Sequence, residues 1–169
     1  TDPTFGILGY YEGHKEESEN TPAVYRLDPE TKKLTMMVDD VPGPNGLAFS
    51  PDEKLLYIAD TGASHMKDGP KHIRKFAVES DSSLTFIGIF AECTASMFDG
   101  FRVDTKGRLW TSAADGVHCY DPDGTLIGKI RIPEFVSNLT FGGARRNRLF
   151  ITGTTSLYSV YVTATGIGM

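Results

Sequence analysis

The feature that most constrains the fold is one short pattern that occurs three times. It reads "PNGLAFSPDEKLLYIADTG" at 44–62, "FDGFRVDTKGRLWTSAADG" at 98–116 and "SNLTFGGARRNRLFITGTT" at 137–155. Each copy has a polar residue, a short apolar run, a tight turn and a second apolar run. Because self-similarity at such intervals is typical of repeat architectures, in which each unit packs on its neighbours, we expect a stack of similar hairpin units.

The residues around these hairpins favour further strands. No window shows the apolar spacing of a long helix, and 18 glycines and 9 prolines divide the chain into short runs. Many runs are rich in Val, Ile, Phe, Tyr and Thr, which suit a pleated sheet. More strands are expected at 72–80 and 83–91, at 116–124 and 125–132, and at 156–166, and 23–40 reads as the outer hairpin of an earlier unit.

Four antiparallel strands in about 40–50 residues are typical of one blade of a β-propeller. We therefore predict an all-β fold, a β-propeller of about three and a half blades of four-stranded antiparallel sheet. Propellers close into rings of about 4–8 blades, and this chain would leave two open flanks. The opening "TDPTFG" has no initiator Met and reads like the end of a strand. We expect residues 1–169 to be a partial propeller domain, the C-terminal part of a longer chain, with self-association or completion by another chain as the alternative.

Charge and composition argue against several partners. The net charge of −5 and the absence of any basic run longer than a pair disfavour nucleic acid. No apolar run reaches the roughly 18–20 residues that span a bilayer, so no membrane partner is expected. Cys93 and Cys119 do not form a Cys-x-x-Cys pair, and the four histidines share no spacing, which disfavours a thiolate or histidine metal site.

The polar residue of each repeat is the strongest candidate for function. It is Asn45 in the first copy, Asp99 in the second and Asn138 in the third. The innermost strands of a propeller line a central channel, so equivalent positions converge on its axis. Amide and carboxylate oxygens there suit a hard cation such as Ca²⁺. The alternative is turn chemistry, because Asn-Gly and Asp-Gly are common turn pairs. Asn138, which precedes Leu139, could instead hydrogen-bond the channel wall.

Three further residues are candidates for lining the channel, each with a structural alternative. Asp2 could face the channel, as we expect Asp60 to do, or could cap a turn. Arg102 is close to Asp99 in sequence, but alternate residues of a strand point to opposite faces. His65 could lie at the channel mouth or in a solvated loop.

Taken together, the three repeats and their extensions, "GVHCYDPDG" after the second and "SLYSVYV" after the third, resemble the C-terminal half of the SMP-30/gluconolactonase/luciferin-regenerating-enzyme family. The resemblance covers essentially the whole chain. It implies a six-bladed propeller with a divalent cation, usually Ca²⁺, in the central channel, and hydrolysis of lactones such as gluconolactone. It also implies that Asn45 and Asp99 are metal ligands. A Glu and a second Asn of the family's ligand set have no counterpart here.

The resulting hypothesis is a metal-dependent hydrolase that opens lactone rings, with a small sugar lactone as substrate. Its cofactor would be Ca²⁺ or another divalent cation such as Zn²⁺, Mg²⁺ or Mn²⁺. Asp99 would be catalytic as well as a ligand, since a carboxylate can accept a proton from the attacking water. The alternatives are a phosphotriesterase-like hydrolase using the same cation, and a non-catalytic propeller fragment that serves as a binding scaffold. The oligomeric state stays open.

Overall fold

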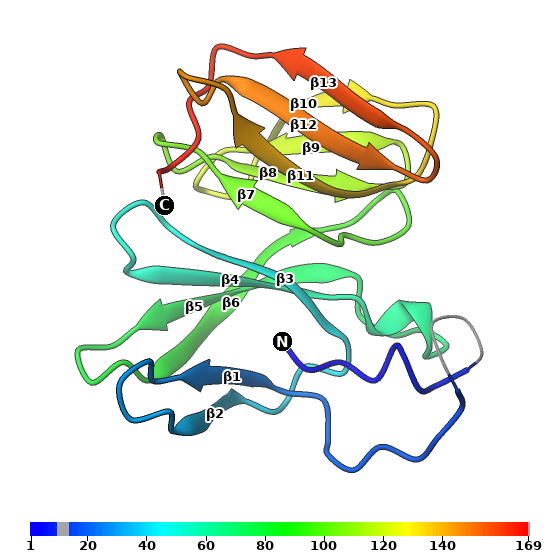
Figure 1. Ribbon diagram of the computed structural model, residues 1–169, viewed down its shortest axis with the longest axis vertical. Helices are drawn as coiled ribbons and strands as arrows, with labels where there is room; N and C mark the ends of the chain where they lie inside the picture. The colour runs from blue at the N-terminus through cyan, green and yellow to red at the C-terminus, as the bar shows by residue number, and fades with distance from the viewer. Residues whose placement is uncertain (10–13, 169) are drawn as a thin grey trace.

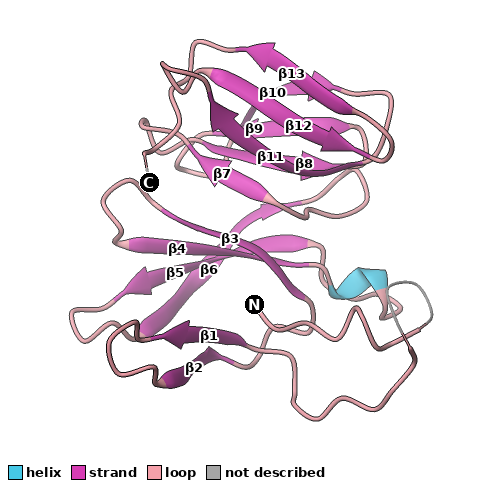
Figure 2. Cartoon of the chain, in the orientation of Figure 1, coloured by secondary structure: helices cyan, strands magenta, loops and turns pink. Residues whose placement is uncertain are grey.

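The computed structural model describes residues 1–9 and 14–168, and strands make up nearly all its regular structure (Figures 1 and 2). A single 3₁₀ turn, η1 (Gly62–Ser64), is the one helical element in the described residues. None of those residues forms a helix long and apolar enough to cross a bilayer. The strands are β1 (Val24–Leu27), β2 (Leu34–Val38), β3 (Pro44–Phe49), β4 (Leu55–Asp60), β5 (His72–Val78), β6 (Leu84–Glu92), β7 (Phe101–Val103), β8 (Leu109–Ala113), β9 (Gly116–Tyr120), β10 (Leu126–Arg131), β11 (Val136–Gly142), β12 (Arg148–Gly153) and β13 (Leu157–Tyr161).

The strands form four antiparallel sheets in which each strand pairs with the next in sequence. The first sheet is β1–β2, the second β3–β6, the third β7–β10 and the last β11–β13. Figure 1 shows the β1–β2 sheet below the β3–β6 sheet, and above them the last two sheets, which overlap in this view. Strand β3 contacts β7, and β7 contacts β11, so the first strands of successive sheets lie side by side. This is the arrangement of propeller blades, and it confirms the predicted partial propeller.

The last blade has three strands in the described part of the chain, one fewer than the two complete blades. After β13 the chain turns back along the neighbouring turns. The Val162 N–H donates to the Asn147 carbonyl at 2.9 Å, and the Thr105 N–H donates to the Thr165 carbonyl at 2.9 Å. The terminal segment thereby joins the last blade to the β7–β8 turn of the blade before it.

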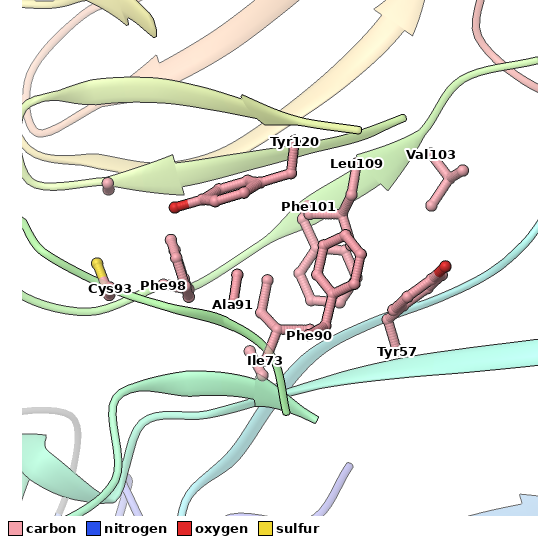
Figure 3. Close-up of a cluster of buried hydrophobic side chains, with 12 residues drawn as sticks. Tyr57, Ile73, Phe90, Ala91, Cys93, Phe98, Phe101, Val103, Leu109 and Tyr120 are labelled. Atoms are coloured by element: carbon pink, nitrogen blue, oxygen red, sulfur yellow. The ribbon is translucent and has the colours of Figure 1, made fainter. Parts of the chain in front are cut away.

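Apolar side chains fill the spaces between neighbouring sheets. Strand β4 is buried on both faces, because Leu56 and Ile58 pack toward the β1–β2 sheet while Tyr57 packs toward the β7–β10 sheet. Figure 3 shows the second of these clusters, where Tyr57, Phe90 and Tyr120 meet between two blades. The Tyr57 and Phe90 rings are 4.9 Å apart in an edge-to-face arrangement, which aromatic pairs favour. These clusters hold successive blades in a fixed relation and so set where the strand ends meet.

The glycines of the repeated "PNG" and "DG" pairs permit a close approach between inner strands. A Cβ on Gly46 would lie 2.2 Å from the Asp99 carbonyl oxygen, and one on Gly100 would lie 2.2 Å from Oδ1 of Asn138. Neither glycine has a positive φ, and Asn45 lies within β3. The turn-pair interpretation is therefore wrong for both positions. At Gly46 a side chain would meet the fixed backbone of the neighbouring blade, whereas at Gly100 it would displace the side chain of Asn138.

The flank at the β1–β2 end of the stack is only partly covered, and it is one of the two open flanks expected of a partial propeller. Leu47 and Phe49 pair with Ile58 and Leu56 across β3 and β4, so they share a face with that buried pair. They are nevertheless 37% and 46% exposed. The β1–β2 sheet covers the β4 side of this face and leaves the β3 side uncovered.

Candidate functional site

A hollow of about 830 Å³ opens where the first strands of neighbouring blades begin. We call it the inner hollow. Its wall includes Asn45, His65 and Asp99, three residues singled out from the sequence, together with Thr61 and Phe135. Pockets for small ligands usually measure about 300–1,000 Å³, so this hollow has a suitable size. The close approach of Gly46 to Asp99 explains why side chains from two different blades reach it.

Asn45 is held by the segment that follows β4. Its amide nitrogen donates to Oγ1 of Thr61 at 3.3 Å, and the buried Thr61 hydroxyl donates to the Gly43 carbonyl at 3.2 Å. Because the amide nitrogen makes this hydrogen bond, the amide oxygen is the atom of Asn45 that can bind a cation.

Asp60, which we expected to face the channel, does not. Asp60 is only 2% exposed. Its carboxylate accepts hydrogen bonds from the N–H groups of Gly43 and Gly62 at 3.0 and 3.2 Å. The carboxylate thus satisfies two buried backbone donors and fixes the chain on either side of Asn45. Its role is structural.

Asp99 is half-buried and comes just before β7. Its backbone N–H donates to Oγ of Ser112 at 3.1 Å, and the Ser112 N–H donates to the Gly100 carbonyl at 3.0 Å. Ser112 belongs to β8 and is fully buried. The backbone at Asp99 is therefore fixed both by the next strand of its own blade and by Gly46 of the neighbouring one.

The other sequence candidates lie outside the wall of the inner hollow. Asn138 is on β11, where its Oδ1 accepts the N–H of Leu139 at 2.9 Å and fills the space beside Gly100. Arg102 is exposed on β7 and donates to the Phe101 carbonyl at 2.7 Å. Asp2 pairs with Ala23 and lies at a separate hollow of about 450 Å³. An equivalent place in the repeat is therefore not enough to put a side chain in the inner hollow.

His65 reaches the hollow from the loop between β4 and β5. The loop is braced by backbone bonds, among them the Ala63 N–H to the Pro70 carbonyl and the His65 N–H to the Gly62 carbonyl. The imidazole ring lies 5.0 Å from the ring of Phe5, which also lines the hollow. This loop therefore presents His65 on an ordered wall beside Asn45.

Sequence reasoning missed the wall that is formed by two connecting segments. Phe135 comes from the β10–β11 connection and Thr154 from the β12–β13 turn. Glu134 joins them, since its carboxylate accepts hydrogen bonds from Oγ of Ser156 and the Tyr158 hydroxyl, each at 2.6 Å, and from the Thr155 N–H at 2.8 Å. These bonds lower the pKa of Glu134 to about 2. Both segments lie outside the aligned polar positions, so the repeat carried no signal for them.

The donors at this site suit a hard cation in kind but not in number. Asn45 and Asp99 offer oxygen atoms, the ligands that Ca²⁺ and Mg²⁺ prefer. Within residues 1–9 and 14–168, no group of three or more His, Cys, Asp or Glu side chains could hold a metal. Since Ca²⁺ takes about 6–8 oxygen ligands, these two residues would supply only part of its coordination.

Known proteins resemble this chain over most of its length. Residues 5–155 match the family model described as the SMP-30/Gluconolactonase/LRE-like region. A gluconolactonase of Zymomonas mobilis is 29% identical over 170 residues, which cover 95% of this chain and 46% of that protein. The lactonohydrolase oryH of Aspergillus oryzae is 32% identical over 149 residues, which cover 78% of this chain and 32% of that protein.

Among solved structures, a gluconolactonase from Xanthomonas campestris superposes with a TM-score of 0.83 at 40% identity, covering 95% of this chain and 52% of that one. The chain thus spans about half the length, or less, of the relatives it matches.

Proposed function

Because the chain belongs to the SMP-30/gluconolactonase/LRE-like family, we propose that it forms part of a metal-dependent hydrolase that opens sugar lactones. Relatives named gluconolactonase and lactonohydrolase support this reaction class. The observation that carries the proposal is the meeting of Asn45 and Asp99 in one hollow. Two blades supply them, and the absence of a side chain at Gly46 lets these blades approach closely beside the Asp99 carbonyl.

In the proposed site, the amide oxygen of Asn45 and the carboxylate of Asp99 hold a divalent cation, Ca²⁺ in the first instance. Such a cation supplies Lewis acidity that polarises a carbonyl group. Asn45 is a neutral ligand and leaves the positive charge of the site undiminished. Its orientation is set in advance by Thr61, so ordering this side chain adds little to the cost of binding.

The proposed role of Asp99 in the reaction is that of a general base. A water molecule attacks the lactone carbonyl carbon, and Asp99 accepts a proton from it as the new C–O bond forms. The bond between that carbon and the ring oxygen then breaks, and the proton passes to the departing alkoxide. The product is the open-chain hydroxy acid, so one water is consumed and Asp99 is regenerated.

The direct test replaces Asp99 with Asn and measures Ca²⁺ affinity by calorimetry and the opening of δ-gluconolactone by acid release. Asp99→Asn should lower Ca²⁺ affinity and turnover together, with a loss of turnover of about 10²-fold or more, since general base catalysis typically contributes 10²–10⁴-fold. The matched control is Asp123→Asn, because Asp123 is exposed in an outer turn where it accepts the Thr125 N–H. The control should change neither quantity.

Three outcomes would contradict parts of the proposal. Equal effects of Asp99→Asn and Asp123→Asn would show that the site is elsewhere. Faster Ca²⁺-dependent cleavage of a phosphotriester than of the lactone would favour the phosphotriesterase alternative. No turnover with any divalent cation, in this chain or in a longer protein that contains it, would favour a binding scaffold.

A further inference from the structure

Phe135 is an apolar side chain in an unusual place. It is 65% exposed, although the next residue, Val136, is 5% exposed and packs in the core between the last two blades. Phe135 is instead part of the wall of the inner hollow. Single exposed hydrophobic residues are common on convex surfaces, but a phenyl ring on the wall of a small-molecule hollow offers contact area to a ligand.

The segment that carries this ring is braced through the side chain of the residue before it. The carboxylate of the neighbouring residue, Glu134, accepts hydrogen bonds from Thr155 and Ser156 of the β12–β13 turn and from Tyr158 of β13, as described above. Gly153 fits closely against this carboxylate, because a Cβ there would lie 2.8 Å from Oε2 of Glu134. A ring on a fixed segment costs less to order on binding than one on a loose loop. The exposure of Phe135 is therefore a property of an ordered wall.

The chemistry of the surrounding wall matches a ring with both polar and apolar parts. Two residues that carry hydroxyl groups, Ser137 and Thr154, line the hollow together with Phe135. The face of a phenyl ring carries partial negative charge, which attracts the partially positive hydrogens of C–H groups. A sugar lactone has C–H groups on the faces of its ring and hydroxyl groups around its edge, so it can meet both kinds of surface at once.

We propose that Phe135 is a specificity-determining residue whose ring stacks on the C–H face of the bound sugar lactone. This inference rests on the proposed function, because it concerns the same hollow and the same substrate. Phe135 acts in binding and takes no part in proton transfer. It should therefore contribute equally to the bound substrate and to the transition state.

Steady-state kinetics with δ-gluconolactone test this role. Stacking contacts of aromatic rings are worth about 0.5–1.5 kcal/mol, so Phe135→Ala should raise KM up to about tenfold and leave kcat within about twofold. Phe135→Tyr keeps the ring face and should restore KM. Tyr161→Ala is the matched control, because Tyr161 is 70% exposed on β13 and is not part of the hollow's wall.

A structural role for Phe135 predicts a different result. If the ring packs against protein, Phe135→Ala should lower the urea midpoint of unfolding and should reduce kcat as well. That result would overturn the proposal. An unchanged KM with unchanged stability would overturn it too.

A binding measurement separates this inference from the proposed reaction. The probe is 1,5-anhydroglucitol, which has the C–H faces of the sugar ring but no carbonyl group to attack. Saturation-transfer NMR should detect its ring protons with the unmodified protein and with Phe135→Tyr, and much less with Phe135→Ala. If no protein opens the lactone but this pattern of binding holds, the reaction is wrong and the stacking stands. If the lactone is opened but Phe135→Ala has the same KM and binds the probe as well as the unmodified protein does, the proposed stacking is wrong and the proposed reaction stands.

Discussion

The contact between Gly46 and the Asp99 carbonyl can be tested by a single methyl group. In Gly46→Ala the new Cβ would lie 2.2 Å from that oxygen, whereas a relaxed C···O contact is about 3.3 Å or longer. Both groups are fixed by the backbone, so no change of side-chain rotamer can relieve the clash. Strands β3 and β7 must separate locally by about 1 Å, which moves Asn45 away from Asp99.

The expected cost follows from two opposing terms. Overpacking of this kind costs about 1–3 kcal/mol. Replacing Gly with Ala also restricts the unfolded chain, which stabilises the protein by about 0.4–1 kcal/mol. The net loss in the free energy of unfolding should be about 1–2 kcal/mol. Because Ca²⁺–oxygen distances span only about 2.3–2.6 Å, a 1 Å separation should also weaken Ca²⁺ binding by about tenfold or more.

Urea unfolding followed by the fluorescence of Trp110, the single tryptophan and a core residue, measures the first effect, and calorimetry measures the second. The control is Gly128→Ala on β10, where a Cβ would meet nothing within 4 Å. It should be neutral or slightly stabilising. If Gly46→Ala unfolds at the same urea concentration as Gly128→Ala and binds Ca²⁺ equally well, the close approach of the two inner strands does not hold the site together.

Two further predictions concern buried polar groups. Burial lowers the pKa of His118 below its ordinary value of 6.5, and its Nε2 lies 2.6 Å from the Asp115 carboxylate. Because the unfolded chain then binds a proton more readily than the folded one, this contribution to stability is present above pH 6.5 and is lost as the pH falls below it. The free energy of unfolding should be measured at pH 5 and at pH 8. It should fall more between pH 8 and pH 5 for the unmodified protein than for His118→Phe, and equal decreases for the two proteins would contradict this. The fully buried Asp104 carboxylate accepts the Nε–H of Arg108 at 2.7 Å and the Nε1–H of Trp110 at 3.0 Å, so Asp104→Ala should cost about 3–5 kcal/mol in urea unfolding. A cost below about 1 kcal/mol would show that these bonds contribute little.

Much of the fold follows from patterns that are local in sequence. Short runs rich in β-branched and aromatic residues predicted strands at 72–80 and 83–91, and the structure has β5 at His72–Val78 and β6 at Leu84–Glu92. The period of two also determines which side chains share a face, as with Leu56 and Ile58 against Tyr57. The repeat itself indicated that successive hairpins stack as blades.

The same patterns predicted only part of the candidate site. The repeat placed Asn45, Asp99 and Asn138 in equivalent positions, yet Asn138 fills the space beside Gly100 and is not in the wall of the inner hollow. The repeat offered no reason to single out Phe135, which belongs to a connection between blades.

What the sequence alone determined is therefore the strands, their faces and their repetition, because these depend on neighbours a few residues apart. Which side chains share the inner hollow was decided only by the tertiary structure. Asn45 and Phe135 are far apart in the chain, and they line one hollow because the cores between blades hold the strand ends and connections in a fixed relation. Contacts of that kind depend on the volumes of the side chains that pack between the sheets, and patterns local in the sequence do not determine these contacts.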